Sequence, residues 1–215
     1  MNTLIDDYTR YHVVLVIAGG ILLLIFILLS IFFWTQFRRT PRGDTHKWSF
    51  EKKVYASFGA LCIIVGLLIA LVTAANASNA LNPRHGFSLL VDSLGTPGGG
   101  TQMAALYRAF NAWIQSGSDN MPSIIQGRVH DRIALNTIRA IFSGVLLIGF
   151  VALSTGIWGT LVRKSRVRES GWGLKERALL VSGVATIALS LVLMVIAERN
   201  MQGAFAPITL VLLYG

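Results

Sequence analysis

The residues of this chain that could carry chemistry are few, and most of them lie outside its apolar stretches. The four histidines are His12, His46, His85 and His130, and Cys62 is the single cysteine. One cysteine cannot form a disulfide within the chain, so a thiol–disulfide oxidoreductase and Cys-ligated zinc or iron–sulfur sites are excluded. Because Cys62 lies in the middle of an apolar stretch, we expect it to serve in packing.

A metal site is the sharpest chemical hypothesis that these residue types allow. The weak candidates are His85, Asp92, His130 and Asp131. Their spacing matches no known ligand pattern. Adjacent residues such as His130 and Asp131 cannot share one helix face, which weakens the hypothesis further. The sequence therefore predicts no cofactor, and a membrane enzyme with an outer His/Asp metal site is only a minor alternative.

Four apolar stretches form the main elements that must position any functional residues of the chain. They cover residues 13–34, 54–75, 140–162 and 178–197, and none contains Asp, Glu, Lys, Arg or His. About 20 helical residues cross a hydrocarbon core of about 30 Å. The chain is 53% hydrophobic and 13% charged, where soluble domains carry about 25% charged residues. These features predict an all-α integral membrane protein with four transmembrane helices arranged as two hairpins in a four-helix bundle.

The distribution of charge predicts the orientation of the chain. Loops 35–53 and 163–177 each hold six basic and two acidic residues, so each has a net charge of +4. The rest of the chain adds +1 to give the total of +9. By the positive-inside rule both loops are cytoplasmic and both termini are extracytoplasmic, in a multi-pass protein of the cell membrane. The basic residues therefore indicate orientation and attraction to anionic headgroups, and we expect no nucleic-acid partner.

Five segments follow from these spans. They are an outer N-terminal segment (1–12), a first hairpin (13–75), an extracytoplasmic segment (76–136), a second hairpin (137–197) and an outer apolar tail (198–215). Pro122 is placed to begin a helix that continues unbroken into the third span.

Within the extracytoplasmic segment, residues 101–115 have the pattern of an amphipathic helix. Apolar residues recur there at spacings of three and four: Met103, Leu106, Tyr107, Phe110, Trp113 and Ile114. Three locations suit such a face, namely the membrane surface, the end of the helical bundle and a partner protein.

Rows of small residues on the third and fourth spans suggest helix–helix seams. The members step by about four residues: Ala152, Gly156 and Thr160, then Ala178, Ser182, Thr186 and Ser190. Small side chains allow close approach of helix backbones, within the bundle or between subunits. A polar path lined by Ser182, Thr186 and Ser190 is the alternative interpretation.

The leading functional hypothesis is a non-catalytic membrane subunit that stabilises or organises a larger membrane protein complex. No charged residue lies within the spans, which disfavours proton coupling through buried carboxylates. The alternative is a small oligomeric transporter or channel component with a Ser/Thr-lined path. The expected partners are membrane lipids, including a bound lipid, and other membrane protein subunits.

Overall fold

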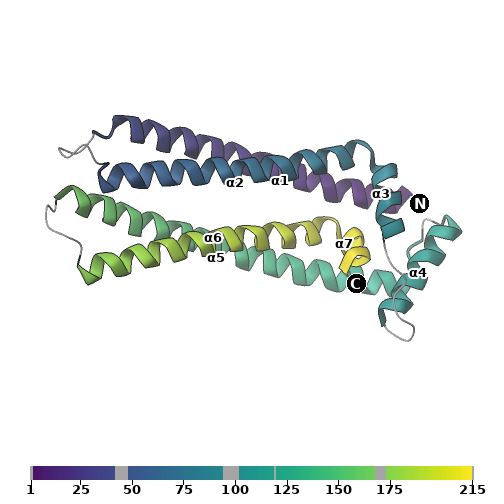
Figure 1. Cartoon of the computed structure of the whole chain (residues 1–215). Coiled ribbons are helices and arrows are strands. Elements are labelled where there is room, and N and C mark those ends of the chain that lie inside the picture. The colour runs from purple at the N-terminus through teal and green to yellow at the C-terminus, as the bar shows by residue number, and fades with distance from the viewer. Residues whose placement is uncertain (1, 42–47, 94–101, 119, 168–172, 215) are drawn as a thin grey trace. The chain divides into compact units, whose positions relative to one another are not determined.

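The computed structural model describes residues 2–41, 48–93, 102–118, 120–167 and 173–214, and the elements assigned in these ranges are helices. Four are long: α1 (Asn2–Arg39), α2 (Phe50–Leu81), α5 (Ser123–Val167) and α6 (Leu174–Phe205) (Figure 1). Each is long and apolar enough to cross a membrane. The prediction of four helices able to span a membrane is confirmed in length and composition.

The long helices continue well beyond the length that a bilayer requires. At 1.5 Å per residue, the 45 residues of α5 extend over about 68 Å, whereas a hydrocarbon core is about 30 Å thick. The helix begins at Ser123, directly after Pro122, as the sequence predicts. Its first 17 residues precede the apolar stretch at Ala140, so about 25 Å of α5 is available for packing outside the hydrocarbon.

Three short helices complete the described chain: α3 (Pro83–Ser93), α4 (Gln102–Ser116) and α7 (Pro207–Tyr214). Gly117 follows α4 with a φ of 61°, and its N–H donates to Ile114 O. Glycine adopts this left-handed conformation without steric cost, which explains where α4 ends. Pro207 opens α7 at the first helical position, where its missing N–H costs no hydrogen bond.

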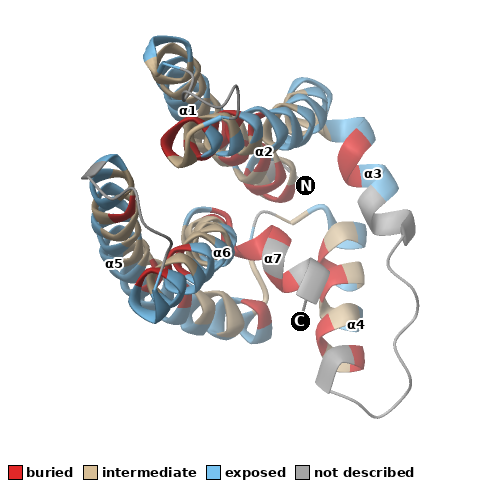
Figure 2. Ribbon diagram, turned by 60° about the vertical axis from the view of Figure 1, so that its left-hand side comes forward, coloured by how far each residue is buried: buried red, intermediate tan, exposed pale blue. Residues whose placement is uncertain are grey.

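The chain divides into two compact units that cut across the long helices. The first unit contains Met1–Ala18, Val72–Phe142 and Ile196–Gly215, and the second contains Gly19–Leu71 and Ser143–Val195. Each long helix therefore contributes to both units. The short helices belong to the first unit, and Figure 2 shows buried residues concentrated on α4 and α7.

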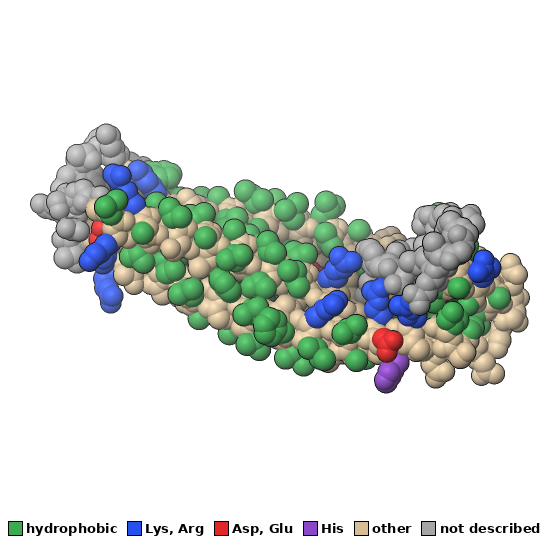
Figure 3. All heavy atoms as spheres, turned by 90° about the horizontal axis from the view of Figure 1, so that it is seen from below, with side chains coloured by type: hydrophobic (Ala, Val, Ile, Leu, Met, Phe, Trp, Pro, Cys, Tyr) green, Lys and Arg blue, Asp and Glu red, His purple; other side chains and the backbone are tan. Residues whose placement is uncertain are grey.

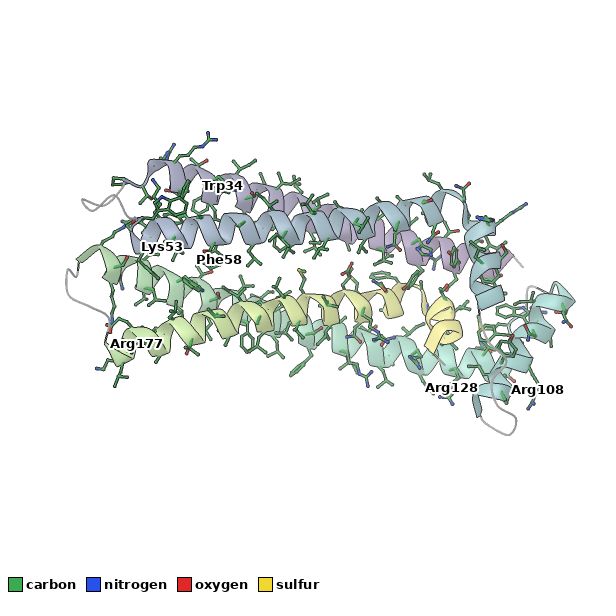
Figure 4. All side chains as sticks on the ribbon, in the orientation of Figure 1. Trp34, Lys53, Phe58, Arg108, Arg128 and Arg177 are labelled. Atoms are coloured by element: carbon green, nitrogen blue, oxygen red, sulfur yellow. The ribbon has the colours of Figure 1, made fainter. Side chains whose placement is uncertain are left out.

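In the second unit, tryptophans pack over glycines of neighbouring helices. A Cβ atom built on Gly59 of α2 would lie 3.1 Å from Nε1 of Trp34 on α1. A Cβ atom on Gly183 of α6 would lie 3.1 Å from Nε1 of Trp158 on α5. Trp158 also meets Phe58, with ring centroids 5.0 Å apart. Figure 4 labels Trp34 and Phe58 on α1 and α2.

Large apolar side chains cover much of the exposed surface of the long helices. Leu71, Ile148 and Val181 are each about 70% exposed, an unfavourable arrangement in water but an ordinary one in lipid. On the face shown in Figure 3, hydrophobic side chains follow one another along the helices, and Lys and Arg gather toward the helix ends.

Candidate functional site

The first unit has a hydrophobic core of its own, built from segments far apart in sequence. Its buried members come from α1 (Leu4, Tyr8), α3 (Phe87), α4 (Leu106, Phe110, Trp113), α5 (Ile125) and α7 (Ile208, Val211). Burial of aromatic and branched aliphatic side chains stabilises such a core by about 1.5–3 kcal/mol per residue. The segments outside the four apolar stretches thus form a packed helical unit.

Helix α4 contributes its apolar residues to this core. Leu106, Phe110 and Trp113 are buried there, and Ile114 packs against them. Trp113 Nε1 also donates to Ser118 O at 2.7 Å, so the polar atom of the indole is satisfied. Tyr107 is half-buried, and the side chain of Met103 lies outside the described residues. The buried face of α4 therefore packs within the first unit. Contact of the α4 face with a membrane surface or a partner stays a prediction.

The N-terminal helix holds the C-terminal helix through a buried carboxylate. Asp7 Oδ2 accepts hydrogen bonds from the backbone N–H of Thr209 at 2.7 Å and from its Oγ1 at 2.8 Å. Thr209 is the third residue of α7, and the first N–H groups of a helix have no partner within it. Asp7 therefore caps α7 from 202 residues away in sequence, and its charge suits the positive end of the helix dipole.

A second polar group links α1 to α2 in the same unit. Asn76 Nδ2 donates to Val72 O at 2.7 Å, which leaves Asn76 Oδ1 to accept from His12 Nδ1 at 2.6 Å. The His12 ring also meets the edge of Tyr8, with centroids 4.4 Å apart. These contacts place His12 in a structural role. The hydrogen bond to Asn76 fixes the orientation of the His12 ring between α1 and α2.

Gly86 permits close approach of α3 to α1. A Cβ atom on Gly86 would lie 2.5 Å from Tyr8 Oη and 3.1 Å from two carbons of the Tyr8 ring. Real Cβ contacts are not this short, so the position requires glycine while the Tyr8 ring stays where it is.

The candidate metal ligands whose side chains the structure describes lie on two different helices. His85 lies on α3, and His130 and Asp131 lie on α5, with all three exposed. The side chain of Asp92 is outside what the structure describes. Among the described residues, no group of three His, Cys, Asp or Glu side chains is close enough to hold a metal ion. The metal hypothesis has no geometric support in this part of the chain.

Two hydroxyl groups in the α6 row, those of Thr186 and Ser190, donate to carbonyls of their own helix. Thr186 Oγ1 donates to Gly183 O at 2.9 Å, and Ser190 Oγ donates to Thr186 O at 2.8 Å. Thr186 is buried, Ser190 is half-buried, and Ala178 and Ser182 are exposed. The Thr186 and Ser190 hydroxyls donate within α6 and keep their acceptor lone pairs, and the polar-path interpretation stays a prediction.

The predicted row on α5 is more exposed than the row on α6. Ala152 and Gly156 are exposed, and Thr160 is half-buried with its Oγ1 donating to Gly156 O at 2.8 Å. A Cβ atom on Gly156 would meet nothing within 4 Å, and the same holds for Gly149 and Gly159. Within its own unit, Gly149, Ala152, Gly156 and Gly159 thus form an exposed row of small residues, and the seam stays a prediction.

Ion pairs connect helices at the end of the second unit that carries the basic loops. Arg166 Nε donates to Glu51 Oε2 at 2.9 Å and its Nη2 donates to Glu51 Oε1, which makes the pair bidentate. Lys164 Nζ donates to Glu176 Oε1 at 3.3 Å. Glu51 lies on α2 and Arg166 on α5, so this pair joins helices from the two halves of the sequence.

Comparison of the chain with protein-family models, with curated proteins and with solved structures found no match.

The polar groups that sequence reasoning missed are Asp7 and its partner Thr209. The sequence contains one indication of the role of Asp7. A carboxylate only six residues before an apolar stretch is costly near lipid unless it has a polar partner. The identity of its partner could not be read from the sequence, since the two residues come from opposite ends of the chain. The contacts of the first unit join segments that are distant in sequence, and α5 presents an exposed row of small residues. The polar contacts described above are structural ones.

Proposed function

We propose that this chain is a non-catalytic membrane subunit that stabilises or organises a larger membrane protein complex. The observation that carries the proposal is the row of small residues on α5, Gly149, Ala152, Gly156 and Gly159. They recur at spacings of three and four, which keeps them on one helix face. In membranes such faces let a second helix approach closely enough for extensive van der Waals contact.

The contrast with the occupied glycines supports an intermolecular role. Gly59 and Gly183 are each covered by a tryptophan of a neighbouring helix, whereas Gly156 meets open space. The helix contacts within the second unit thus use other glycines, and the α5 row is left for a helix of another subunit.

The topology that goes with this proposal is two hairpins, α1 with α2 and α5 with α6. The contacts of Trp34 with Gly59 and of Trp158 with Gly183 support these pairings. The net charge of +4 in each short loop supports a cytoplasmic location for both loops and an extracytoplasmic location for both termini. The segment 76–136, which contains α4, would then be extracytoplasmic.

The test is a Gly156→Leu variant, compared with Gly20→Leu as a matched control. Gly20 also has nothing within 4 Å of a built Cβ, but it lies on α1 and outside the row. Tagged full-length chains are extracted in mild detergent, and co-purifying proteins and native mass are measured. We expect the wild type and Gly20→Leu to retain the same partners and Gly156→Leu to lose them. Circular dichroism and a thermal melt of each purified variant check that folding is intact.

A wild-type chain that is a monomer and retains no partner would overturn the proposal. So would a folded Gly156→Leu variant that keeps every partner of the wild type.

A further inference from the structure

A groove of about 420 Å³ runs between α1 and α2 within the second unit. One wall is formed by Leu23, Ile27 and Ile31 of α1, and the other by Cys62, Gly66 and Ala70 of α2. Along α2 the small residues step by four, so they share one helix face and leave space beside the bulky residues of α1. A Cβ atom on Gly66 would already be in van der Waals contact with Leu23 and Phe26, at 3.8 Å.

The groove is open to the surroundings, and its rim is apolar. Ile27, Ile31, Ile63 and Leu67 line it and are between 43% and 66% exposed. The lining lies entirely inside the apolar stretches 13–34 and 54–75, at a depth where hydrocarbon replaces water. An acyl chain is the apolar, flexible ligand that is present there at high concentration.

Charge at the nearer helix end identifies the kind of lipid. The last turn of α1 carries Arg38 and Arg39, which are both exposed. Arg38 follows Ile31 by seven residues, about 10 Å along the helix. The headgroup region of a bilayer begins at the edge of its hydrocarbon core, which lies between Ile31 and Arg38 along α1. A lipid whose tail lies in the groove would therefore place its phosphate at the level of the two arginines.

Lys53 is exposed at the same end of α2, whereas Lys52 is engaged within the chain. Lys52 Nζ donates to Thr40 O at 2.8 Å and lies 4.9 Å from the centroid of the Phe37 ring. It is buried and directed at the chain itself. Guanidinium groups bind phosphate oxygens bidentately, which gives Arg38 and Arg39 the complementary chemistry.

We propose that the groove between α1 and α2 binds one acyl chain of an anionic phospholipid, whose phosphate is held by Arg38 and Arg39. This assigns a location to the bound lipid that the sequence predicts. The tail gains little from leaving a bilayer that is equally apolar, so the selectivity comes from the headgroup. Two arginines near an anionic surface correspond to a preference of roughly 30-fold over a zwitterionic lipid. The site is independent of the contact proposed along α5.

The test uses full-length protein in vesicles that contain a photoactivatable phosphatidylglycerol or the matching phosphatidylcholine, each with a diazirine in mid-chain. Cross-linked positions are mapped by mass spectrometry. We expect cross-links on the groove residues of α1 and α2, with a clear excess for phosphatidylglycerol. An R38Q/R39Q variant should lose that excess. An R163Q/R177Q variant removes two exposed arginines from α5 and α6 and should keep it.

A second variant tests the groove itself. Ala70→Phe fills the groove and should abolish the cross-links there, whereas Gly20→Leu adds bulk on α1 outside the groove lining and should not. A thermal melt of each variant separates groove filling from loss of folding, and R38Q/R39Q involves only exposed side chains.

Three results would overturn the proposal. They are equal cross-linking of the two lipids in the wild type, cross-links spread evenly over all four spans, and cross-links from the groove to a second copy of the chain in place of lipid.

Discussion

Replacement of Asp7 by alanine tests the strongest long-range contact in the first unit. The substitution removes the acceptor of two hydrogen bonds from Thr209. Thr209 is buried, with only 1% of its surface exposed. Thr209 lies in the first turn of α7, where no carbonyl of the same helix precedes it by three or four residues to replace the carboxylate.

The expected magnitude follows from these two bonds. A hydrogen bond to a charged group contributes about 1.5–3 kcal/mol, and a buried unsatisfied donor costs about 1–3 kcal/mol. We therefore expect Asp7→Ala to lower the free energy of opening α7 by about 2–4 kcal/mol. Asp7→Asn keeps one acceptor oxygen and should cost less. Thr209→Val removes only the hydroxyl and should cost about 1 kcal/mol.

Hydrogen exchange of the α7 amides measures this free energy locally. Each 1.4 kcal/mol corresponds to a tenfold change, so a loss of 2 kcal/mol accelerates exchange about 30-fold. Peptides that cover residues 207–214 are followed in detergent at constant pH. Asp6→Ala is the matched control, because Asp6 carries the same charge one residue earlier and is exposed. The reasoning is refuted if Asp7→Ala leaves α7 exchange unchanged, or if Asp6→Ala accelerates it as much.

Two further substitutions test the core of the first unit. Trp113→Ala deletes a buried aromatic side chain and should destabilise the unit by about 3–5 kcal/mol in a thermal or denaturant melt. Trp48→Ala, at a residue that is 46% exposed, should cost far less. Equal losses would contradict the placement of Trp113 in the core. Gly86→Ala forces the Tyr8 ring to move and should cost about 1–3 kcal/mol. Gly127→Ala, at an exposed helical glycine with open space around it, should instead stabilise by about 0.5–1 kcal/mol, so a similar loss at both glycines would show that the Tyr8 contact is not the cause.

The metal hypothesis shows what spacing alone can and cannot predict. His85, His130 and Asp131 were singled out by residue type, and the structure leaves them exposed on two different helices. Residue type indicates which chemistry is possible. Only the fold decides whether the ligands converge, because convergence depends on how distant helices pack.

Sequence by itself determines the spanning helices of this protein. Hydrophobicity over about 20 residues is a local property, and lipid requires every backbone group in such a stretch to be paired within a helix. The start of α5 after Pro122 is local for the same reason, since proline is preorganised for the first turn. The apolar residues of α4 indicated that one face of that segment should be covered.

Tertiary structure alone decided what covers each surface. It placed Phe110 and Trp113 of α4 in a core with residues from both ends of the chain. It joined Asp7 to Thr209 across 202 residues. It also divided the long helices between two units, a boundary that no local pattern marks. Glycines show the difference most simply: Gly59 and Gly156 both lie inside apolar stretches, but a Cβ atom on Gly59 would meet Trp34, whereas one on Gly156 would meet nothing within 4 Å. A small residue permits close packing, and the neighbour that uses it is set by the arrangement of helices in space.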